Sequence, residues 1–563
     1  MSADNARIGE MFDRLADLLE IEDANPFRIR AYRNGAQTVR EHPRSMADLI
    51  NEEKDLRELP GIGKDLAEKI RAIVETGRLP ALEEVEARTP GVLSDLMKIP
   101  GLGPKKVKAL YKELNIRSVA DLRTAAREQR IRGLPGFAAR TEEQILRRTE
   151  KFSVEERRFN LLEAEQIKNP LMEWMEKLDG LSQLIVAGSF RRRKETVGDL
   201  DLLVTARRNT PVMEHFTGYE EIAEVVSRGT TRSTVRLVSG MQVDLRLVPK
   251  TSYGAALHYF TGSKTHNIAI RKMGVKRKLK VNEYGVFRGD KQIGGRTERA
   301  VYGLFDMPYI EPELREFRGE IEAALENRLP RLVGPKAIHG DMLCYATDAR
   351  STSALAKRAV EREYEWLGVC FDSEGGLDRK QIITWRRALD RTGQRLGIEL
   401  LLIGEAAIAK DGSIVADQEL LSEFDLVAVV VRDGMHLDHG AQTRRLLRAL
   451  ENPHVKLLTS PTGRVIGRYP GMDYDLKRVL AFAAERECMV GLDARPDRLD
   501  LSDEACRLAK EVGATVAICS HARTPDELDN LRFGLDQARR GWLERGDLVN
   551  TRNSGVIRGQ FPH

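Results

Sequence analysis

The chain has 563 residues, 41% of them hydrophobic, and no long apolar run, so we expect several domains and no membrane-spanning segment or signal peptide. Its five cysteines lie between Cys344 and Cys519 without C-x-x-C spacing, which argues against a zinc site and favours a reducing cytoplasm. The net charge is +5, but residues 1–330 carry 57 Lys and Arg against 51 Asp and Glu, whereas residues 331–563 carry 34 against 35. A polyanionic partner is therefore expected at the front of the chain.

Residues 5–80 predict helices with a loop at Asn25-Pro26. The segment from Leu59 to Ile70 places two glycines in a tight turn before a helix, and the outward-facing amides of such a turn bind phosphate without reading base sequence. The pattern recurs from Ile99 to Lys106. One such turn is also typical of an ordinary helix connection, but two followed by lysine-bearing amphipathic helices indicate helix-hairpin-helix clamps on a DNA backbone. The predicted DNA contacts are Gly61, Gly63, Lys64, Gly101, Gly103 and Lys105.

The central motif is Val186–Val204, VAGSFRRRKETVGDLDLLV. A short apolar strand ends in a Gly188-Ser189 turn, four basic residues follow, and a second strand starts at Asp199. Because strand side chains alternate, Asp199 and Asp201 point the same way, about 7 Å apart. Two such carboxylates repel each other unless a cation lies between them, and oxygen ligands suit Mg²⁺ together with substrate phosphates. The turn and the basic residues favour phosphate binding, so the motif predicts a nucleotidyl-transfer site.

A third carboxylate, Asp244, lies in the alternating segment from Gln242 to Val248. It would complete the ligands of two metal ions for an in-line phosphoryl displacement. A bare D-x-D is also typical of a solvated strand edge, but the Gly-Ser turn, the arginines and the third aspartate together favour catalysis. We therefore expect Asp199, Asp201 and Asp244 to be the catalytic residues and the ligands of two Mg²⁺ (or Mn²⁺) ions.

These motifs, together with VDLRLVP, YGAALHYFTGSKTHNIAIR and NEYGVF, resemble those of bacterial family X DNA polymerases (PolX) along almost the whole chain. The resemblance implies a multidomain α+β and α/β protein. Its expected parts are a helical DNA-end or lyase-like domain (1–85), a helix-hairpin-helix DNA-binding domain (86–154), a linker helix and nucleotidyltransferase palm (155–250), a nucleotide-binding thumb or fingers subdomain (251–330) and a C-terminal PHP-like β/α barrel (335–563). It further implies a monomeric, cytoplasmic, nucleoid-associated DNA polymerase that adds dNTPs at gapped or primer-template DNA and fills short gaps in base excision repair.

The resemblance also implies the contacts of the incoming nucleotide. They are Gly188, Ser189, Arg192, Tyr259, Phe260, Gly262, Asn267 and Arg271. The aromatic pair would lie against the sugar and exclude a 2′-hydroxyl, while Asn267 and Arg271, four residues apart, would face the minor groove of the nascent pair. The alternative for these last two is that they are solvated helix residues. Gln242 stands where the family usually has an arginine that orients the third aspartate, which leaves Arg246 and puts the metal geometry in question.

A lyase lysine, which would attack a deoxyribose C1′ as a Schiff base, corresponds to Lys69 in this sequence, with Tyr32 and Arg28 near it. An amine nucleophile needs its pKa lowered by burial or by neighbouring cations. Asp65, one helical turn before Lys69, works against this. Contact with phosphate alone is therefore an equal alternative for Lys69.

From about residue 335, short apolar strands alternate with amphipathic helices, which suggests a β/α barrel. The resemblance implies a PHP phosphoesterase domain, but its metal-binding histidine positions read Leu343, Tyr345, Arg432, Ser460 and Arg523. Only Glu405 clearly remains, so we expect no metal and no 3′→5′ exonuclease activity, and a barrel kept as a structural or DNA-positioning domain. The alternative is a rebuilt site from Asp341, Asp372, Glu405 and His521.

Two functions therefore compete for the whole chain. One is a template-directed, Mg²⁺-dependent repair polymerase. The other is a DNA-binding repair scaffold or weakly active nucleotidyltransferase that uses the clamps and the barrel. The three intact strand aspartates favour the polymerase.

Overall fold

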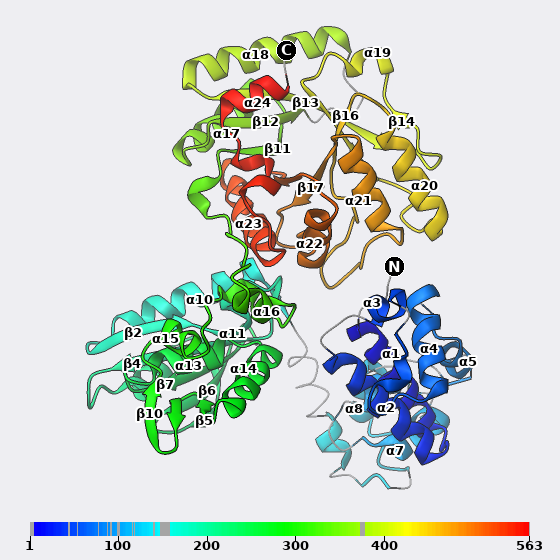
Figure 1. Ribbon diagram of the computed structural model, residues 1–563, viewed down its shortest axis with the longest axis vertical. Helices are drawn as coiled ribbons and strands as arrows, with labels where there is room; N and C mark the ends of the chain where they lie inside the picture. The colour runs from blue at the N-terminus through cyan, green and yellow to red at the C-terminus, as the bar shows by residue number, and fades with distance from the viewer. Residues whose placement is uncertain are drawn as a thin grey trace. The chain divides into compact units, whose positions relative to one another are not determined.

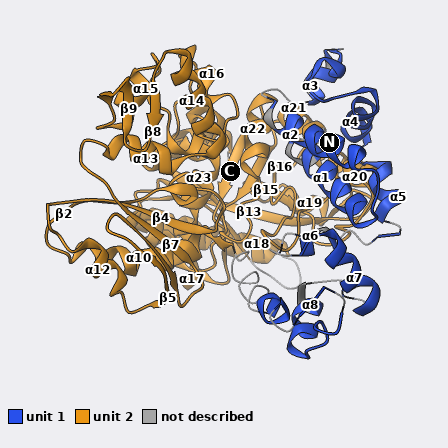
Figure 2. Ribbon diagram, turned by 90° about the horizontal axis from the view of Figure 1, so that it is seen from below, with its two compact units in different colours: residues 1–157 blue, residues 158–563 orange. Residues whose placement is uncertain are grey.

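The computed structural model describes residues 5–561 except 43–45, 53, 77, 87, 90–92, 98, 100–101, 115, 117–118, 135, 139–140, 147–157 and 372–377. The chain forms two compact units, residues 1–157 and 158–563, coloured blue and orange in Figure 2. None of the described helices is long and apolar enough to cross a membrane.

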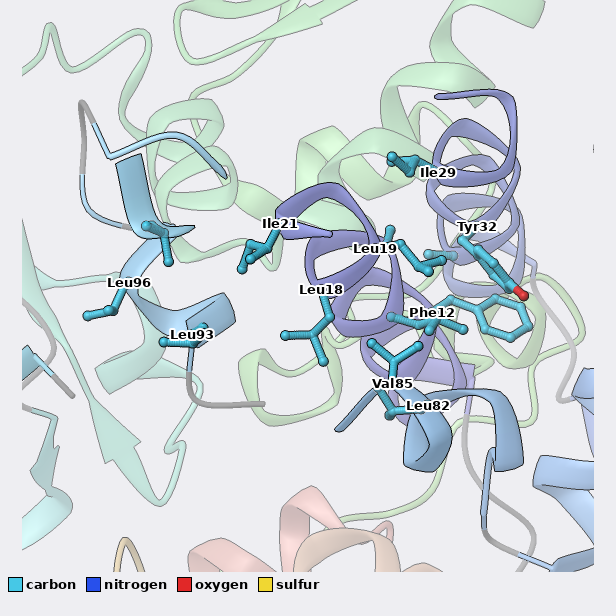
Figure 3. Packing of buried hydrophobic residues seen from close by; sticks show 14 of the residues in the cluster. Phe12, Leu18, Leu19, Ile21, Ile29, Tyr32, Leu82, Val85, Leu93 and Leu96 are labelled. Carbon is cyan, nitrogen blue, oxygen red and sulfur yellow. The ribbon is translucent and has the colours of Figure 1, made fainter. Parts of the chain in front are cut away.

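Unit 1 consists of short helices around one hydrophobic core. They include α1 (Asn5–Ile21), α2 (Pro26–Glu41), α3 (Met46–Asn51), η1 (Leu56–Glu58), α4 (Lys64–Thr76), α5 (Pro80–Glu86), α6 (Leu93–Met97), α7 (Pro104–Leu114) and α8 (Val119–Arg127). Helix α2 begins after Asn25, whose side chain accepts a hydrogen bond from the Phe27 N–H and so satisfies one of the free amides of the first turn. Phe12 of α1 lies against Tyr32 of α2 with ring centroids 5.7 Å apart, and Val85 of α5 belongs to the same core (Figure 3).

Unit 2 begins with a five-stranded sheet in the order β2-β4-β7-β6-β5. Its strands are β2 (Leu181–Val186), β4 (Asp199–Ala206), β5 (Ile222–Arg228), β6 (Arg232–Leu237) and β7 (Gln242–Leu247), with α10 (Leu161–Glu176), α11 (Gly188–Arg191), α12 (Val212–Thr217) and the strand pair β1 (Phe159–Asn160) and β3 (Thr196–Val197) around them. Strands β4 and β7 are parallel neighbours at its centre. Leu200, Leu202 and Val204 of β4 are buried in the core, so the alternation leaves Asp199 and Asp201 on the opposite face, as predicted.

A second, smaller group of elements follows the sheet. It comprises α13 (Tyr253–Thr261), α14 (Lys264–Lys276), β8 (Lys280–Asn282), β9 (Gly285–Arg288), β10 (Lys291–Gly294), α15 (Glu298–Gly303), η2 (Pro312–Leu314) and α16 (Glu320–Leu325). Glu298 is buried here and accepts hydrogen bonds from Arg315 at 2.6 Å and from Arg191 of α11 at 2.6 Å. This buried ion-pair network joins the group to the five-stranded sheet.

The C-terminal part is a parallel barrel in the order β11-β12-β13-β15-β16-β17-β18 (Figure 1). The strands are β11 (Gly340–Ala346), β12 (Trp366–Phe371), β13 (Glu399–Ile408), β15 (Leu426–Val430), β16 (Val455–Leu458), β17 (Met489–Asp493) and β18 (Val516–Cys519), with β14 (Ile414–Val415) antiparallel to β13. The edge strands nearly close the barrel, because Tyr345 donates its N–H to Ala522 at 2.8 Å. The predicted β/α barrel is confirmed.

Helices cover the outside of this barrel. They are η3 (Pro335–Ala337), α17 (Ala349–Glu361), α18 (Arg379–Leu396), α19 (Gln418–Leu421), α20 (His439–Leu450), α21 (Leu476–Glu485), α22 (Asp503–Glu511), η4 (Pro525–Asn530), α23 (Leu531–Arg540), η5 (Arg545–Asp547), η6 (Val549–Thr551) and α24 (Ser554–Gln560). Helix α23 also packs against η2 of the preceding group, and Arg539 of α23 forms a 2.9 Å ion pair with Glu313 of η2. The barrel is thus packed directly against the rest of unit 2.

Candidate active site

One pocket of about 680 Å³ lies beside the five-stranded sheet, between its strand β4 and helices α13 and α14. It is lined by Arg158, Gly188, Ser189, Arg192, Lys194, Gly198, Asp199, Asp201, Tyr259, Phe260, Gly262, Lys264, Asn267, Ile268 and Arg271. All eight residues predicted to contact the nucleotide are on this list, together with two of the three predicted catalytic aspartates. Residues up to 113 positions apart in sequence, Arg158 and Arg271, therefore meet in one cavity.

The three aspartates lie on the two parallel central strands. Asp201 of β4 is the register partner of Asp244 of β7, and Asp199 stands two residues before Asp201 on the same face. Burial, and then the charges of Asp199 and Asp244, raise the pKa of Asp201 to about 7. Burial and the charge of Asp244 raise the pKa of Asp199 in the same way. Burial and mutual repulsion thus disfavour the charged forms of Asp199 and Asp201.

Asp244 is held by its neighbours on the sheet. Its Oδ1 accepts hydrogen bonds from Thr234 at 2.6 Å and Arg232 at 3.2 Å, and its Oδ2 accepts one from Gln242 Nε2 at 2.9 Å. Gln242 therefore orients the third aspartate without a charge, while Arg232 of β6 supplies the charge from the next strand. Arg246, left as the helper in the sequence interpretation, lies over the Phe260 ring at 4.4 Å instead.

Gly188 must be a glycine at this place. It has φ +62°, and a Cβ on it would lie 2.4 Å from Asp201 Oδ2. The expected Gly-Ser turn is the start of the short helix α11, whose first residues face the pocket. Because the backbone of Gly188 lies this close to Asp201, the amides of the turn lie in the same cavity as the aspartate side chains.

The four basic residues after the turn have separate environments, and of them only Arg192 was predicted to contact the nucleotide. Arg191 is half of a buried ion pair with Glu298, and Arg193 forms ion pairs with Glu165 and with Asp536 of the barrel. Of the four, the pocket includes only Arg192 and Lys194. Their side-chain environments, rather than their charge alone, decide which of them a phosphate can reach.

Arg192 is fixed at the edge of the pocket. Its Nε donates to Glu316 at 3.0 Å and its Nη1 donates to the backbone oxygen of Thr261. A Cβ on Gly262, which has φ +69°, would lie 3.2 Å from the same Nη1. The glycine after α13 thus leaves the room that the guanidinium occupies.

The aromatic pair and α14 form the other wall. The Tyr259 and Phe260 rings meet edge to face with centroids 5.2 Å apart. Asn267 donates to the Tyr259 carbonyl at 2.6 Å, and its buried Oδ1 has no hydrogen-bond partner in the described part of the chain. Arg271 lies one turn further along α14 and is exposed. Asn267 is therefore partly a structural residue, with one acceptor left for a base edge.

Family models match about half of this chain, in four segments between residues 3 and 316. Residues 158–246 match the DNA polymerase beta palm and residues 256–316 the DNA polymerase beta thumb. Residues 3–79 match a helix-hairpin-helix domain and residues 93–151 a SAM-like helix-hairpin-helix tandem. The chain is also 30% identical over 556 residues to the DNA polymerase/3'-5' exonuclease PolX of Bacillus subtilis (strain 168), covering 96% of both chains. This chain belongs to the PolX family of DNA polymerases.

About half of the chain is also similar to eukaryotic enzymes. DNA polymerase lambda of Rattus norvegicus is 25% identical over 345 residues, 56% of each chain, and that of Arabidopsis thaliana is 25% identical over 348 residues, 55% of this chain and 62% of its own. The protein is accordingly a template-directed DNA polymerase that binds DNA and dNTPs and uses a divalent metal cofactor.

Five lining residues of the polymerase pocket were missed by sequence reasoning. They are Arg158, Lys194, Gly198, Lys264 and Ile268. Lys194 and Gly198 belong to the central motif, and their closeness to Asp199 in the sequence could have indicated that they line the pocket. Arg158 precedes the first strand of unit 2 and Lys264 starts α14, and neither is part of a pattern that predicts phosphate contact.

The two glycine turns of unit 1 precede helices, as predicted. Gly61 has φ +77° and Lys64 is the first residue of α4, while Lys105 is the second residue of α7. A Cβ on Gly63 or on Gly103 would meet no atom within 4 Å, so both turns are open at these points. Gly101 lies outside the described residues.

Lys69 of α4 forms an ion pair with Asp65, one turn earlier in the same helix. Tyr32 is buried with its hydroxyl unpaired among the described atoms, and Arg28 lies 5.9 Å from the Tyr32 ring centroid. This pairing with Asp65 is the feature that the sequence indicated as unfavourable for a Schiff-base lysine.

The barrel positions that correspond to PHP ligands are filled by other interactions. Arg432 forms a 2.7 Å ion pair with Glu405, and Tyr345 donates its hydroxyl to Glu405 at 2.9 Å and lies 3.2 Å from His521 Nδ1. Arg523 lies 4.6 Å from the Tyr345 ring centroid. The charge of Glu405 is thus paired with Arg432, and its other oxygen accepts a hydrogen bond from Tyr345. Within the described ranges, no three carboxylate, imidazole or thiol side chains are arranged to hold a metal ion as they stand, in the barrel or beside the sheet.

The remaining acids of the barrel are also engaged. Burial raises the pKa of Asp341 to about 7, and its Oδ1 accepts hydrogen bonds from the backbone of Ser520 and Leu343. Asp493, which sequence reasoning overlooked, is fully buried and paired with Arg495. Asp372, a candidate for a rebuilt site, lies outside the described residues.

Proposed function

We propose that the chain fills short gaps in DNA during base excision repair, using two divalent ions, Mg²⁺ or Mn²⁺, held by Asp199, Asp201 and Asp244. The carrying observation is the pocket that gathers the eight nucleotide contacts beside the aspartates. The donor set fits the ions, since burial and the neighbouring carboxylates raise the pKa of Asp199 and of Asp201, a cost that a bound cation would offset. When bound, such ions neutralise charge on the transferring phosphoryl group and on the attacking and leaving oxygens.

The residues of the pocket then have separate tasks. The amides of Gly188 and Ser189 and the guanidinium of Arg192 bind the triphosphate oxygens. The wall formed by Tyr259 and Phe260 excludes a 2′-hydroxyl by shape. Asn267, with its free Oδ1 held in place through the Tyr259 carbonyl, reads the minor-groove edge of the new base pair together with Arg271. A scaffold without catalysis would have no use for this combination of contacts.

The proposed gap-filling role is tested on a one-nucleotide gapped duplex with and without a 5′-phosphate at the far side of the gap. We expect insertion of the complementary dNTP only, and more efficient insertion when the 5′-phosphate is present. Equal efficiency on gapped and simple primer-template DNA would remove the gap-filling assignment. Absence of any templated insertion would favour the scaffold.

The glycine turns of unit 1 are proposed to bind DNA phosphates. Replacing Gly63 or Gly103 by Ala leaves room in the free protein but puts a methyl group where a phosphate would approach, so we expect about tenfold weaker binding to all DNA sequences alike. Fluorescence anisotropy at several salt concentrations measures this, and affinity should fall steeply with salt because bound counterions are released. Gly133→Ala, which is equally unhindered in the same unit, is the control. A flat salt response contradicts the proposal.

Lyase activity through Lys69 is proposed as a second activity of unit 1. Borohydride should trap a covalent adduct on DNA with a 5′-deoxyribose phosphate, and Lys69→Ala should remove it. Asp65→Asn should increase trapping, because it removes the carboxylate that holds the Lys69 side chain in an ion pair. An undiminished adduct in Lys69→Ala, with Lys54→Ala at an exposed position of the same unit as the control, rules out this assignment.

The barrel is proposed to have lost its metal site and to act as a structural or DNA-positioning domain. We expect no Mn²⁺-dependent 3′→5′ degradation of single-stranded DNA and no stoichiometric metal in an Asp199→Asn, Asp201→Asn, Asp244→Asn variant, in which the three candidate ligands of the palm are replaced and those of the barrel remain. Nuclease assays and elemental mass spectrometry measure both. Stoichiometric transition metal, with exonuclease activity that disappears on Glu405→Ala, would show a rebuilt site.

Three organisational points complete the proposal. The five segments 1–85, 86–154, 155–250, 251–330 and 335–563 are proposed as domains with the roles given above. All five cysteines are buried and free of disulfides, which suits a reducing cytoplasm. Association with the nucleoid is proposed from the predicted DNA binding. The protein is proposed to act as a monomer.

A further inference from the structure

A second cavity of about 550 Å³ lies within unit 2, where the sheet domain meets the barrel. Its wall is dominated by basic side chains, namely Arg158, Lys194, Arg318, Arg464 and Arg540. Two of these, Arg158 and Lys194, also line the polymerase pocket. The two cavities therefore share a wall, and the barrel contributes cations to a space that adjoins the expected triphosphate site. We call it the junction cavity.

Most of the cations in the junction cavity are paired. Arg464 of the barrel forms a 2.6 Å ion pair with Glu195, and Arg318 and Arg540 both pair with Asp503 at 3.2 Å and 2.6 Å. These pairs fix the wall between the two parts of the unit. They also hold the arginines in place, so that little side-chain freedom is lost when an anion binds.

Neither of the two shared cations has a carboxylate partner among the residues that the structure describes. Arg158 donates to the hydroxyl and the backbone oxygen of Thr196 at 2.8 Å and 2.7 Å, so its charge is not neutralised. The Lys194 ammonium has no hydrogen bond or ion pair to any described residue. Its burial lowers its pKa. A partly buried ammonium without a partner is costly, and an anion in the cavity would offset that cost.

We propose that the junction cavity binds inorganic pyrophosphate as it leaves the polymerase pocket. The inference rests on the proposed function, in which the primer 3′-oxygen bonds to the α-phosphorus, the bond to the β-phosphate breaks, and pyrophosphate departs with that electron pair. Arg192 marks the triphosphate end of the pocket, and Lys194 follows it by two residues into the junction cavity. Five cations against the three carboxylates Glu195, Asp503 and Glu504 leave an excess positive charge suited to a polyanion.

The barrel gains a role from this arrangement. Arg464 follows the Pro461-Thr462-Gly463 turn, and Arg540 ends α23, so both belong to the domain whose metal ligands are replaced. Figure 1 shows α22 and α23 on the side of the barrel next to α11 and α16. The barrel thus supplies part of a product site for the neighbouring polymerase without holding a metal.

The ion pair between Arg464 and Glu195 permits a test that separates structural damage from the effect of charge. Arg464→Gln and Glu195→Gln break the same pair, but the first removes a positive charge from the cavity and the second a negative one. Structural damage would change pyrophosphate binding in the same direction in both variants, whereas the charge effect would change it in opposite directions. Product inhibition of primer extension by added inorganic pyrophosphate is measured in both full-length variants, and binding of pyrophosphate alone is measured by calorimetry. We expect the inhibition constant to rise about fivefold in Arg464→Gln and to fall about fivefold in Glu195→Gln. Arg208→Gln, on an exposed turn of the same domain, is the control and should match wild type.

Three results overturn the proposal. One is a shift of the inhibition constant in the same direction in both variants, which would indicate structural damage. An unchanged inhibition constant in both variants would likewise show that the cavity has no role in binding pyrophosphate. The third is an opposite-signed change in DNA affinity with unchanged pyrophosphate inhibition, which would assign the cavity to DNA. Failure of the proposed function is distinguishable, because it appears as absent templated insertion by the wild-type protein before any pyrophosphate is added.

Discussion

Replacing Asp201 by Asn is expected to lower the rate of nucleotide insertion at least about 10³-fold, on the order of 4 kcal/mol of transition-state stabilisation. Asp201 is the most strongly perturbed of the three aspartates, with burial and two neighbouring carboxylates raising its pKa to about 7. The amide keeps the shape of the side chain but loses the charge that holds a divalent ion. Single-turnover insertion on a primer-template duplex measures the effect, and Asp199→Asn and Asp244→Asn should behave alike.

The control for this change is Asp179→Asn, which removes the same charge from an exposed position of the same domain. It should leave the insertion rate within twofold of wild type. DNA affinity should change little in all four variants, because the clamps are on unit 1. Normal extension by Asp244→Asn would mean that the third ligand has been misassigned.

Replacing Glu298 by Gln is expected to destabilise the group of elements around α13 to α15 by about 3 kcal/mol. Arg315 is fully buried, and Glu298 is its carboxylate partner at 2.6 Å, shared with Arg191. Although burial alone would raise it, the hydrogen bond from Arg191 and the charge of Arg315 hold the pKa of Glu298 at about 2. Loss of the charge leaves two buried guanidinium groups without compensation.

Hydrogen exchange of peptides from residues 253–316 measures the free energy of local opening in this variant. Glu322→Gln, an exposed position on α16, is the control. Since the folded pKa is depressed, the contribution of Glu298 is fully present above its unfolded value of 4.5 and is lost as the pH falls toward 2. The difference between variant and wild type should therefore shrink on acidification. A difference below about 1 kcal/mol at pH 7 would show that the network contributes little.

The strands that carry the aspartates were predictable because alternation puts charged and apolar residues on opposite faces. Leu200 and Leu202 enter the core and Asp199 and Asp201 do not, and this follows from the period of the strand alone. The parallel pairing that brings Asp201 opposite Asp244 was not available from either segment separately, because register depends on the whole sheet.

The roles of the basic run after Ser189 were not predictable. Arg191 and Arg193 are identical in type and two residues apart, yet their carboxylate partners are Glu298 and Asp536, far along the chain. The run resembles a phosphate-binding patch only because it is rich in basic residues. The carboxylate that each arginine pairs with is decided by tertiary packing. For the same reason, Gln242 weakened the prediction for Asp244, although its amide donates the hydrogen bond that orients that carboxylate.

The most direct test of the central claim is the number of metal ions in the ternary complex. The full-length protein is mixed with a one-nucleotide gapped duplex whose primer ends in a dideoxynucleotide, and with the complementary dNTP, and bound Mn²⁺ is counted by electron paramagnetic resonance. We expect two ions per complex in the wild-type protein and fewer in Asp201→Asn and Asp244→Asn, with Asp179→Asn equal to wild type. An unchanged count of two in the Asp201 and Asp244 variants would contradict the assignment of these aspartates as the metal ligands.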